Sequence, residues 1–341
     1  MRFGVIGAGV IGKLRAQSVR SNPATTLVAV ADTNGAAASA AAGGARAVLD
    51  YREIIADPGV DAVMVCSPLP LHEAMCVEAF AAGKHVLCEK PLAGSVEACR
   101  RILDAARSAG KTLAVGFNHR FYPSFNYVKQ VLAGGRIGQV DHVRVFGGHD
   151  GLHNFRADWQ YKGPLSGGGA MMDVGIHMTD LARWIGGEIA EVYGSSANRV
   201  WHVEGSEDIA IAVMKTRDGI PIQYQATWDE WKGYQSAIEV YGTGGMVRGA
   251  YAPMYNLLIT HDKPGAPRRR EVKRYPEIMV REKLKGWQTT SYLSFVEELA
   301  GFLEMVAGRP SQLADGLSGL RAVEIAHGVY RSSATGEVVR F

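Results

Sequence analysis

The sequence predicts an α/β domain with a doubly wound parallel sheet, followed by an α+β domain with a large, open and mainly antiparallel sheet. Two observations predict this fold class. In the first 120 residues, short apolar runs of strand length alternate with segments of helical periodicity, as is typical of a parallel sheet covered by helices on both faces. From about Phe121, strand-like runs follow one another with turn signals between them, which indicates antiparallel neighbours.

The length of the chain also favours two domains, because 341 residues exceed what one hydrophobic core normally holds. We therefore predict a nucleotide-binding domain over 1–120. A second domain over 121–341 is predicted to serve substrate binding and oligomerisation. Its C-terminal helix is able to pack back on the first domain.

Near-continuous apolar runs suit strands that are buried on both faces. In the first domain such strands are predicted in RFGVIG (2–7), LVAVAD (27–32), DAVMVCSP (61–68), HVLCEKP (85–91) and TLAVGF (112–117). Helical periodicity predicts helices over 10–20, 71–82 and 96–108.

In the second domain, helices are predicted over 123–133, directly after the glycines at 167–169, and over 292–307 and 317–332. Strands are predicted in 138–149, 190–200, 208–216, 220–231, 235–243 and 255–262. The basic run RRREVKR (268–274) contains no interleaved aromatic residues, so we interpret it as a solvated loop or an edge strand and not as a nucleic-acid site.

The composition is that of a globular protein, with 47% hydrophobic and 21% charged residues and a formal net charge of only +3. This charge predicts neither nucleic acid nor an anionic membrane as a partner. The chain opens on MRFGVIGAG without a secretory leader, and no apolar run is long enough to span a membrane. We expect a cytoplasmic protein whose four cysteines are reduced core thiols.

The motif GAGVIG places glycines at 7, 9 and 12, after a predicted strand and at the start of a predicted helix. In this context the three glycines allow a tight turn, the approach of a pyrophosphate to the backbone, and close helix–strand packing. The phosphates would lie at the helix N-terminus, whose unpaired N–H groups favour an anion. We therefore predict a Rossmann-type cofactor site that includes Gly7, Gly9, Val10, Ile11 and Gly12.

Asp32 ends the second predicted strand, about 20 residues beyond the motif. A carboxylate at this point accepts hydrogen bonds from the adenosine ribose and repels a 2′-phosphate. The residues that follow it are Thr33 and Asn34, and neither is an arginine that would bind that phosphate. The predicted cofactor is NAD, with NADP less favoured.

Lys90 lies in CEKPLAG (88–94), at the end of the fifth predicted strand. Doubly wound sheets bind their ligands at this carboxyl edge. Pro91 restricts the backbone at Lys90 to extended conformations, and Glu89 precedes it in a strongly apolar region. A lysine held in this way is able to hydrogen-bond a substrate oxygen, or to act as an acid or base.

The stretch GGGAMMDVGIHMTDLARW (167–184) reads as one helix after its glycines, and it places Asp173, His177 and Asp180 along one edge. Apolar residues flank this edge on both sides, which argues against a solvated seam. Two ligands one turn apart do not make a zinc or iron site, so we predict no metal. An active site is favoured, because three ionisable groups on a largely apolar helix are costly to bury without a function. Asp180 is assigned a structural role.

Five motifs, GAGVIG, SPLPLHEAM, EKPLAG, GFNHRFYP and GGGAMMDVGIHMTDL, occur in this order. Together they resemble the glucose-fructose oxidoreductase, inositol dehydrogenase and rhizopine catabolism family of NAD(P)-dependent oxidoreductases. The resemblance covers essentially the whole chain, and its most specific elements are EKP and DxGxHxxD. Neither of them specifies a substrate.

The resemblance implies a role for individual positions of this chain. The catalytic lysine of the family falls on Lys90, its paired aspartate and histidine fall on Asp173 and His177, and a cis bond is implied before Pro91. Further cofactor contacts are implied for Ser67, His72, Glu89, Lys90 and Asn118. Substrate contacts are implied for Lys90, Arg120, Trp159, Tyr161, Asp173 and His177.

The chemistry of these side chains agrees with that placement. Oxidation of a secondary alcohol sends a hydride to the nicotinamide and the hydroxyl proton to a base. Histidine suits the second task because its ordinary pKa lies near neutrality. Our hypothesis is that His177 exchanges the proton, Asp173 binds an adjacent hydroxyl and Lys90 polarises the reacting oxygen. Whether Lys90 or His177 is the formal base stays open at this point.

The predicted function is hydride transfer between NAD and a secondary hydroxyl of a sugar, a sugar derivative or a cyclitol. One alternative is an NAD-dependent glycosidase or lyase that uses a transient oxidation and releases no net NADH. Another is a non-enzymatic sugar or nucleotide sensor of the same fold, which should have lost the lysine or the histidine. Trp184, Trp228 and Trp231 are interpreted as packing residues. The open antiparallel sheet needs a cover for its outer face, which predicts a homodimer or homotetramer.

Overall fold

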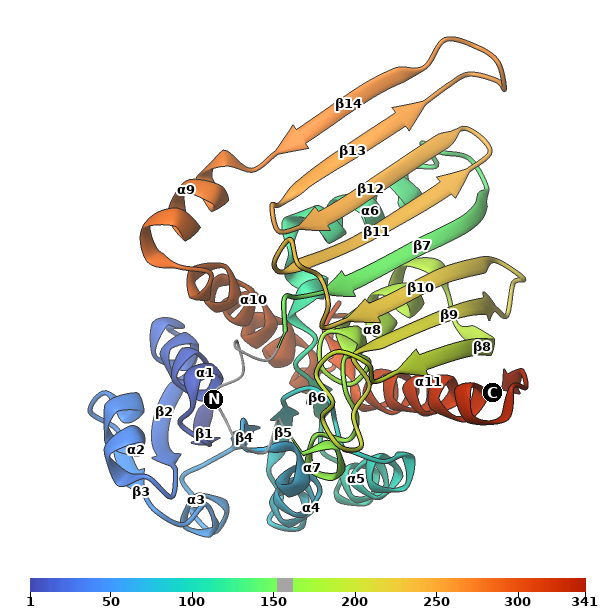
Figure 1. Cartoon of the computed structure of the whole chain (residues 1–341). Coiled ribbons are helices and arrows are strands. Elements are labelled where there is room, and N and C mark those ends of the chain that lie inside the picture. Colours follow the sequence, from blue (N-terminus) through green and yellow to red (C-terminus); the bar gives the residue numbers. More distant parts are fainter. Residues whose placement is uncertain (152–161) are drawn as a thin grey trace. The chain divides into compact units, whose positions relative to one another are not determined.

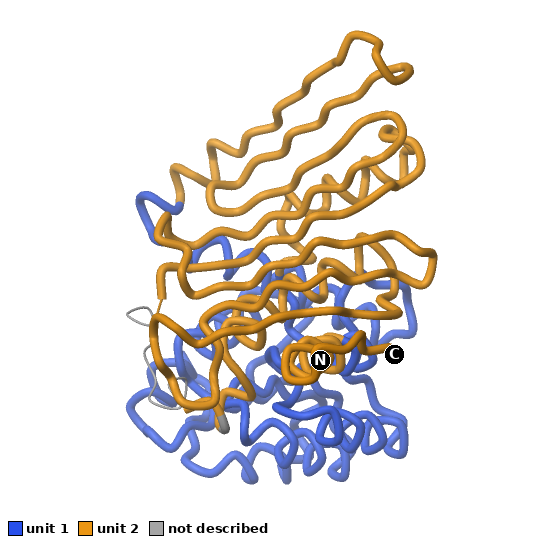
Figure 2. The backbone as a smooth tube through the Cα atoms, turned by 45° about the vertical axis from the view of Figure 1, so that its right-hand side comes forward, with its two compact units in different colours: residues 1–118, 282–321 blue, residues 119–281, 322–341 orange. Residues whose placement is uncertain are grey.

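The computed structural model describes residues 1–151 and 162–341 and separates the chain into two compact units (Figure 2). The first unit contains 1–118 and 282–321, and the second contains 119–281 and 322–341. This grouping differs from a division at residue 120, because α10 (Gln288–Val306) packs on α1 (Val10–Ser21), with Phe302 against Phe3. The functional boundaries at residue 120 stay a prediction.

The first unit is built on a seven-stranded sheet in the order β15-β6-β5-β4-β1-β2-β3 (Figure 1). Its parallel strands are β1 (Arg2–Ile6), β2 (Thr26–Ala31), β3 (Arg46–Val48), β4 (Ala62–Val65), β5 (His85–Cys88) and β6 (Leu113–Val115), and β15 (Ala314–Asp315) joins β6 in the antiparallel sense. The doubly wound parallel sheet predicted from the sequence is therefore confirmed.

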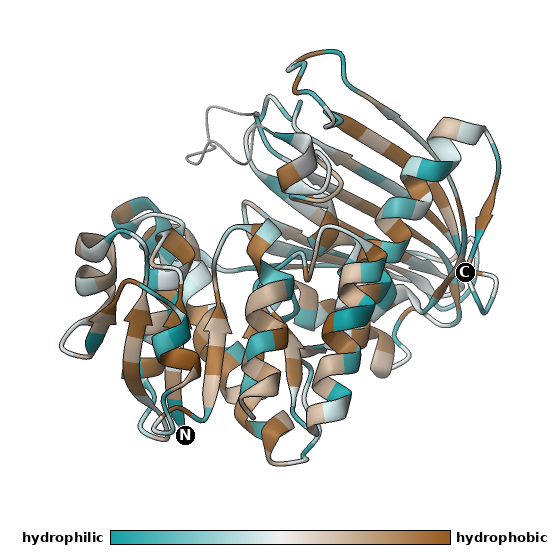
Figure 3. Ribbon diagram, turned by 90° about the horizontal axis from the view of Figure 1, so that it is seen from below, coloured by the Kyte–Doolittle hydropathy of each residue, from teal (hydrophilic) through white to brown (hydrophobic). Residues whose placement is uncertain are grey.

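Helices cover both faces of this sheet, as the continuous burial of its central strands requires. Besides α1 and α10 these are α2 (Gly35–Ala42), α3 (Arg52–Ile55), α4 (His72–Ala81) and α5 (Val96–Ala109), with a 3₁₀ turn η1 at Leu69–Leu71. Figure 3, coloured by hydropathy, shows that the strands are mainly apolar and that the helices carry both polar and apolar residues. Ser95 caps α5 through its hydroxyl, which accepts from the Ala98 amide.

The second unit is built on a nine-stranded sheet in the order β14-β13-β12-β11-β7-β10-β9-β8-β16. Its strands are β7 (Val140–Gly148), β8 (Ile189–Ala197), β9 (Ile209–Thr216), β10 (Pro221–Thr227), β11 (Gln235–Gly242), β12 (Gly245–Tyr251), β13 (Tyr255–Thr260), β14 (Arg269–Arg274) and β16 (Val339–Arg340). Every neighbouring pair is antiparallel except β7 with β10. The predicted large, mainly antiparallel sheet is confirmed.

Helices lie on one face of this second sheet. They are α6 (Pro123–Ala133), α8 (Gly175–Gly186) and the later part of α11 (Gly316–Thr335). The other helical elements of the described residues are η2 (Asn118–Phe121), α7 (Gly163–Ser166) and α9 (Pro276–Lys285). α6 packs on β12 and α8 packs on β7 and β10. Val143, Val240 and Val247 are buried on this face.

Two elements show where the sequence pattern was incomplete. The basic run forms the edge strand β14, one of the two forms predicted for it, and all six of its residues are exposed. β12 was not predicted, because its composition, GMVRGAY, contains two glycines and an arginine and lacks a clean alternation. Across the described residues, no helix has both the length and the apolar character needed to cross a membrane.

Candidate active site

The glycine turn after β1 has the geometry that a dinucleotide site requires. Gly7 has φ +95°, and a Cβ there would lie 2.6 Å from the carbonyl oxygen of Cys66. A Cβ on Gly12 would lie 1.9 Å from the Gly7 oxygen, so α1 approaches the turn as closely as glycine allows. Gly9, by contrast, faces open space at the N-terminus of α1 and has no side-chain cap. The turn therefore leaves room for a pyrophosphate beside the helix amides.

Asp32 directly follows β2 and is joined to this turn. Its Oδ2 accepts from the Ala8 amide at 2.7 Å, and its Oδ1 accepts from the Asn34 amide at 2.8 Å. Each carboxylate oxygen has a second lone pair for a ribose hydroxyl. Asn34 uses its side chain to cap α2, where it accepts from the Ala36 and Ala37 amides. The residues around Asp32 fit NAD.

Lys90 is half-buried in the turn that follows β5, and the Lys90–Pro91 peptide bond is cis, as the resemblance implied. His72 lies beside this turn with its ring enclosed in the core. Its Nδ1 is 3.0 Å from the Pro91 oxygen, and its Nε2 is 3.0 Å from the Ser67 oxygen. Burial lowers the pKa of His72, although these two carbonyls oppose that shift. His72 therefore lies between the loops that follow β4 and β5, where the neutral ring donates to one of the two oxygens and the protonated ring donates to both.

Asp173 does not lie on the helix to which the sequence pattern assigned it, and that expectation was wrong. α8 begins at Gly175, and 170–174 form turns. The hydrogen bonds here are irregular: the Met172 and Asp173 amides both donate to the Gly169 oxygen, and the Gly175 amide donates to the Ala170 oxygen. A regular helix from residue 170 is therefore not formed.

A buried glutamate binds the backbone at the start of this turn. Glu207 accepts from the Gly169 amide at 2.8 Å and from the Met171 amide at 2.6 Å, and Tyr330 donates to it at 3.0 Å. Burial raises the pKa of Glu207, against the lowering effect of these donors. Glu207 thus holds the backbone just before Asp173 in place.

Two side chains from the sheet hold the Asp173 carboxylate. His149 Nε2 lies 2.9 Å from Asp173 Oδ2, and the Trp228 indole donates to the same oxygen at 3.2 Å. The Gly151 amide donates to His149 Nδ1 at 3.2 Å. Because Nδ1 accepts there, we assign the Nε2–H tautomer, in which His149 donates to Asp173. The carboxylate is 30% exposed on its side chain and keeps a defined orientation.

His177 lies one turn further on, in the first turn of α8, and is 8% exposed. Its ring faces that of His119, with centroids 4.1 Å apart and planes 37° apart. His119 in turn stands 3.2 Å from the Tyr234 hydroxyl through Nε2 and also contacts the Tyr122 ring. The His177 imidazole is thus fixed against an aromatic cluster, with Asp173 four residues before it.

Asp180 has the structural role assigned to it. Arg120 donates two hydrogen bonds to its carboxylate, from Nε to Oδ2 at 2.8 Å and from Nη2 to Oδ1 at 2.5 Å. The side chains of this ion pair are both almost fully buried. The Arg120 guanidinium also lies 5.7 Å from the centre of the Trp184 ring. Arg120 therefore connects η2 to α8, and a direct substrate contact by it stays a prediction.

Comparison with known proteins decides the family. Residues 1–117 match the model of the oxidoreductase family with an NAD-binding Rossmann fold, and residues 125–248 match the GFO/IDH/MocA C-terminal domain. The chain belongs to the GFO/IDH/MocA oxidoreductase family. It is an NAD-dependent oxidoreductase, and the family predicted from the motifs is confirmed.

Several individual GFO/IDH/MocA proteins are similar to it along nearly their whole length. An inositol 2-dehydrogenase of Rhizobium meliloti is 31% identical, with 98% of this chain and 97% of that protein covered. A 1,5-anhydro-D-fructose reductase of Ensifer adhaerens is 28% identical over 98% and 97% of the two chains. The crystal structure of GenD2 from gentamicin A biosynthesis, in complex with NAD, superimposes with a TM-score of 0.83 at 27% identity and covers 100% of this chain and 96% of that one.

Other predicted site residues of this GFO/IDH/MocA protein differ in how far the structure describes them. Asn118 is buried and donates from Nδ2 to Ser294 Oγ at 2.9 Å. Trp159 and Tyr161 lie outside the described residues. Within 1–151 and 162–341, no group of three or more His, Cys, Asp or Glu side chains is placed to hold a metal ion.

Three residues beside Asp173 and His177 escaped the sequence interpretation: His119, His149 and Trp228. His149 ends a predicted strand, and His119 stands between the two residues that the resemblance singled out, so neither showed a spacing signal. Trp228 is buried, as predicted, but it also donates to Asp173. Trp231 is 67% exposed in the loop after β10 and packs on one side against the Trp201 ring, with centroids 6.0 Å apart.

Replacing Asp180 with asparagine is expected to lower the free energy of unfolding by about 3–5 kcal/mol, because Arg120 would keep a buried charge without its carboxylate. Urea denaturation followed by tryptophan fluorescence measures this change. Asp104→Asn is the matched control, since Asp104 pairs with Arg107 on the surface of α5, and it should change stability by less than about 0.5 kcal/mol. Equal effects of the two substitutions would contradict a stabilising role for the Arg120–Asp180 pair.

Proposed function

We propose that this protein transfers a hydride between NAD and a secondary hydroxyl of a sugar, a sugar derivative or a cyclitol such as an inositol. The observation that carries the proposal is the Asp173 carboxylate, which His149 and Trp228 orient, together with His177 one turn beyond it. A carboxylate that fixed donors orient is suited to binding a sugar hydroxyl. The relatives named inositol 2-dehydrogenase and 1,5-anhydro-D-fructose reductase support this substrate class.

The side chains divide the chemistry between them. NAD supplies the hydride acceptor when it is bound. A ring nitrogen of His177 takes the hydroxyl proton as the alcohol is oxidised and returns it in reduction. Asp173 accepts a hydrogen bond from a neighbouring hydroxyl and so orients the ring. The Lys90 ammonium donates to the reacting oxygen, where it stabilises the negative charge that develops as the proton leaves.

The appearance of NADH absorbance tests this function with a panel of inositols, aldoses and glycosides. We expect NAD reduction with at least one polyol or sugar that offers adjacent secondary hydroxyls. Cleavage of a glycoside without net NADH would replace the dehydrogenase by the glycosidase or lyase alternative. NADH binding without turnover of any member of the panel would favour a sensor.

Asp32→Ala tests the preference for NAD. Loss of the carboxylate removes an acceptor for the ribose hydroxyls and a charge that repels a 2′-phosphate. The ratio of kcat/KM for NAD to that for NADP is expected to fall by about 10- to 100-fold, as for the loss of a hydrogen bond to a charged group. Asp50→Ala, which removes an exposed carboxylate of the same unit, should leave this ratio unchanged. An unaltered ratio in Asp32→Ala would disprove the assignment.

We also propose that the outer face of the second sheet forms the contact of a homodimer or homotetramer. Tyr193 on β8 lies opposite Val213 on β9, and the neighbouring Ile211 points to the same face. Their exposures are 50%, 59% and 49%, which is high for apolar strand residues. Further along the same row, Glu239 lies opposite Arg144 on β7 and Arg248 on β12. This mixture of apolar and paired charged residues suits contact with a second copy.

Val213→Arg is expected to shift the protein toward the monomer, because the row would then carry an unpaired charge at its apolar end. Sedimentation velocity at micromolar concentration measures the mass. Leu49→Arg, at a residue that is 62% exposed in the first unit, should keep the mass of the wild type. A wild-type protein that is already monomeric would remove this proposal.

For the cellular setting we propose the cytoplasm, with neither nucleic acid nor a membrane as partner. All four cysteines are free thiols, as in a reducing compartment. On the basic strand β14, Arg269 pairs with the Asp262 carboxylate, and Glu271 pairs with Arg136. The run 268–274 contains no aromatic residue on which a base could stack, which argues against a nucleic-acid-binding surface.

A further inference from the structure

We propose that Arg15 and Glu298 are positioning residues that fix the main chain at Lys90 through Glu89. The proposal rests on the proposed function in one respect, namely that Lys90 contacts the reacting oxygen. All the residues involved belong to the first unit. Neither Arg15 nor Glu298 was a candidate from the sequence pattern.

The contacts around Arg15 are close and largely buried, with the Glu89 side chain 13% exposed. Its Nη2 lies 2.6 Å from Glu89 Oε1, and its Nε donates to the same oxygen at 2.7 Å. On its other side, Nη1 lies 2.6 Å from Glu298 Oε2. The side chains of Arg15 and Glu298 have no exposed surface, and the Phe295 ring lies 3.9 Å from the guanidinium carbon. Arg15 therefore links α1, the end of β5 and α10.

This arrangement costs free energy that a fold selected only for stability would not need to spend. One cation and two carboxylates are taken out of water, and the group carries a net charge of −1. Burial by itself lowers the pKa of Arg15, but Glu298 and Glu89 raise it well above its ordinary value, so the guanidinium stays charged. Apolar residues of similar volume often stabilise a core as well as such a group does. The need to hold Glu89 in one position accounts for the presence of this charged group.

The backbone is also shaped to admit the guanidinium. A Cβ on Gly116 would lie 2.6 Å from Arg15 Nη2 and 3.1 Å from both Glu89 carboxylate oxygens. The Gly116 amide donates to the Cys88 oxygen, and the Glu89 amide donates to the Val65 oxygen. The two strands that flank β5 thus hold the main chain up to Glu89, and Arg15 holds its side chain.

Lys90 lies between two such anchors. On one side, Arg15 and Glu298 hold Glu89. On the other, His72 lies 3.0 Å from the Pro91 oxygen and reaches the loop after β4 through Ser67. A three-residue turn that is held at both ends presents its middle side chain in a defined position. Removal of one anchor should therefore impair the Lys90 contact more than it impairs cofactor binding.

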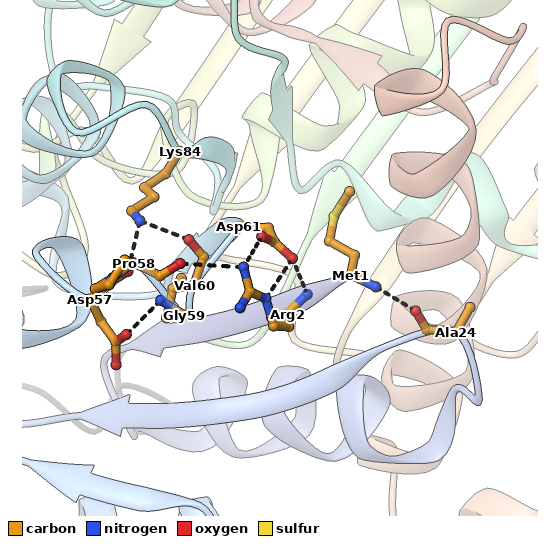
Figure 4. Close-up of polar contacts among 9 residues, drawn as sticks. All are labelled: Met1, Arg2, Ala24, Asp57, Pro58, Gly59, Val60, Asp61 and Lys84. Carbon is orange, nitrogen blue, oxygen red and sulfur yellow. Dashed lines mark hydrogen bonds and ion pairs between the residues drawn. The ribbon is translucent and has the colours of Figure 1, made fainter.

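The test compares Arg15→Met and the double variant Arg15→Met/Glu298→Leu with the wild type. The double variant removes two of the buried charges and keeps an apolar volume, so it should fold stably. We expect turnover at saturating substrate to fall by about 10- to 100-fold in both, as when a positioned group is misplaced, while the affinity for NADH, measured by fluorescence, changes less than about threefold. The control is Arg2→Met, which breaks the exposed Arg2–Asp61 pair in the same unit (Figure 4) and should leave turnover unchanged.

A second readout does not depend on activity. Acetic anhydride labels lysines at a rate set by their environment, and peptide mass spectrometry gives the rate at Lys90 without substrate. We expect this rate to change at least about threefold in the double variant and to stay constant in Arg2→Met. If Arg15→Met does not fold, Glu298→Gln replaces it, and the loss of turnover should then be smaller, by roughly one order of magnitude at most.

A stable double variant with wild-type turnover and wild-type labelling of Lys90 would overturn the proposal. A changed labelling rate at Lys90, in an enzyme whose turnover does not depend on Lys90, would instead support the positioning and refute the proposed chemistry. The two failures are therefore distinguishable.

Discussion

Lys90→Met is expected to lower kcat by a factor of about 10² to 10⁴, the range for a positioned proton donor or acceptor. Methionine keeps much of the length and apolar stem of lysine but donates no hydrogen bond to the reacting oxygen. Because the turn around Lys90 is held by Glu89 and by the His72–Pro91 contact, the loss should be one of chemistry and not of folding. Stopped-flow measurement of NADH formation at saturating substrate gives the rate of the first turnover.

The control for this substitution is Lys283→Met, at an exposed lysine of α9. It should leave kcat within about twofold of the wild type. In Lys90→Met itself, the affinity for NADH should change less than about threefold. A variant without Lys90 that keeps more than about a third of the wild-type turnover would refute the role of Lys90 as the group that polarises the reacting oxygen.

His177→Ala is expected to lower kcat by a similar factor of about 10² to 10⁴, because no group would remain at this position to take the hydroxyl proton. The KM for the polyol should rise less than about tenfold, since Asp173 keeps its two donors from His149 and Trp228. Steady-state kinetics separates the two parameters. Partial recovery of activity by added imidazole would support the loss of a proton acceptor at this position.

His261→Ala serves as the control, since His261 follows β13 and is distant in sequence from the candidate site. It should leave both parameters unchanged. Near-normal turnover of His177→Ala with normal substrate binding would show that His177 is not the base. Lys90 would then be the remaining candidate for that role.

Local sequence predicted most of the first domain because its signals are short-range, although α2, β3 and α3 were not predicted. A buried parallel strand needs an apolar run, and a dinucleotide turn needs three glycines within six residues, so both are visible within GAGVIG and the strand before it. Asp32 was identified by its position at the end of the second apolar run, about 20 residues beyond the motif. The second domain was less predictable, since β12 does not alternate clearly and pairs according to its neighbours β11 and β13.

The candidate site shows the same limit more sharply. The pattern DxGxHxxD identified Asp173, His177 and Asp180 but treated them as members of one helix. Glu207, distant in sequence, binds the amides of Gly169 and Met171, and α8 begins only at Gly175. A contact of this kind leaves no periodic trace in the sequence, because it depends on how the loop before β9 meets the glycine turn.

Residue types at short spacings were enough to predict the fold class, the NAD-binding turn, the family and the candidate residues Lys90, Asp173 and His177. The partners that hold these residues became visible only in the folded chain. His149 and Trp228 reach Asp173 from 24 and 55 residues away, and Arg15 reaches Glu89 from 74 residues away. Such partners meet only after strands and helices have packed, since hydrogen bonds between side chains depend on distance in space and not along the chain.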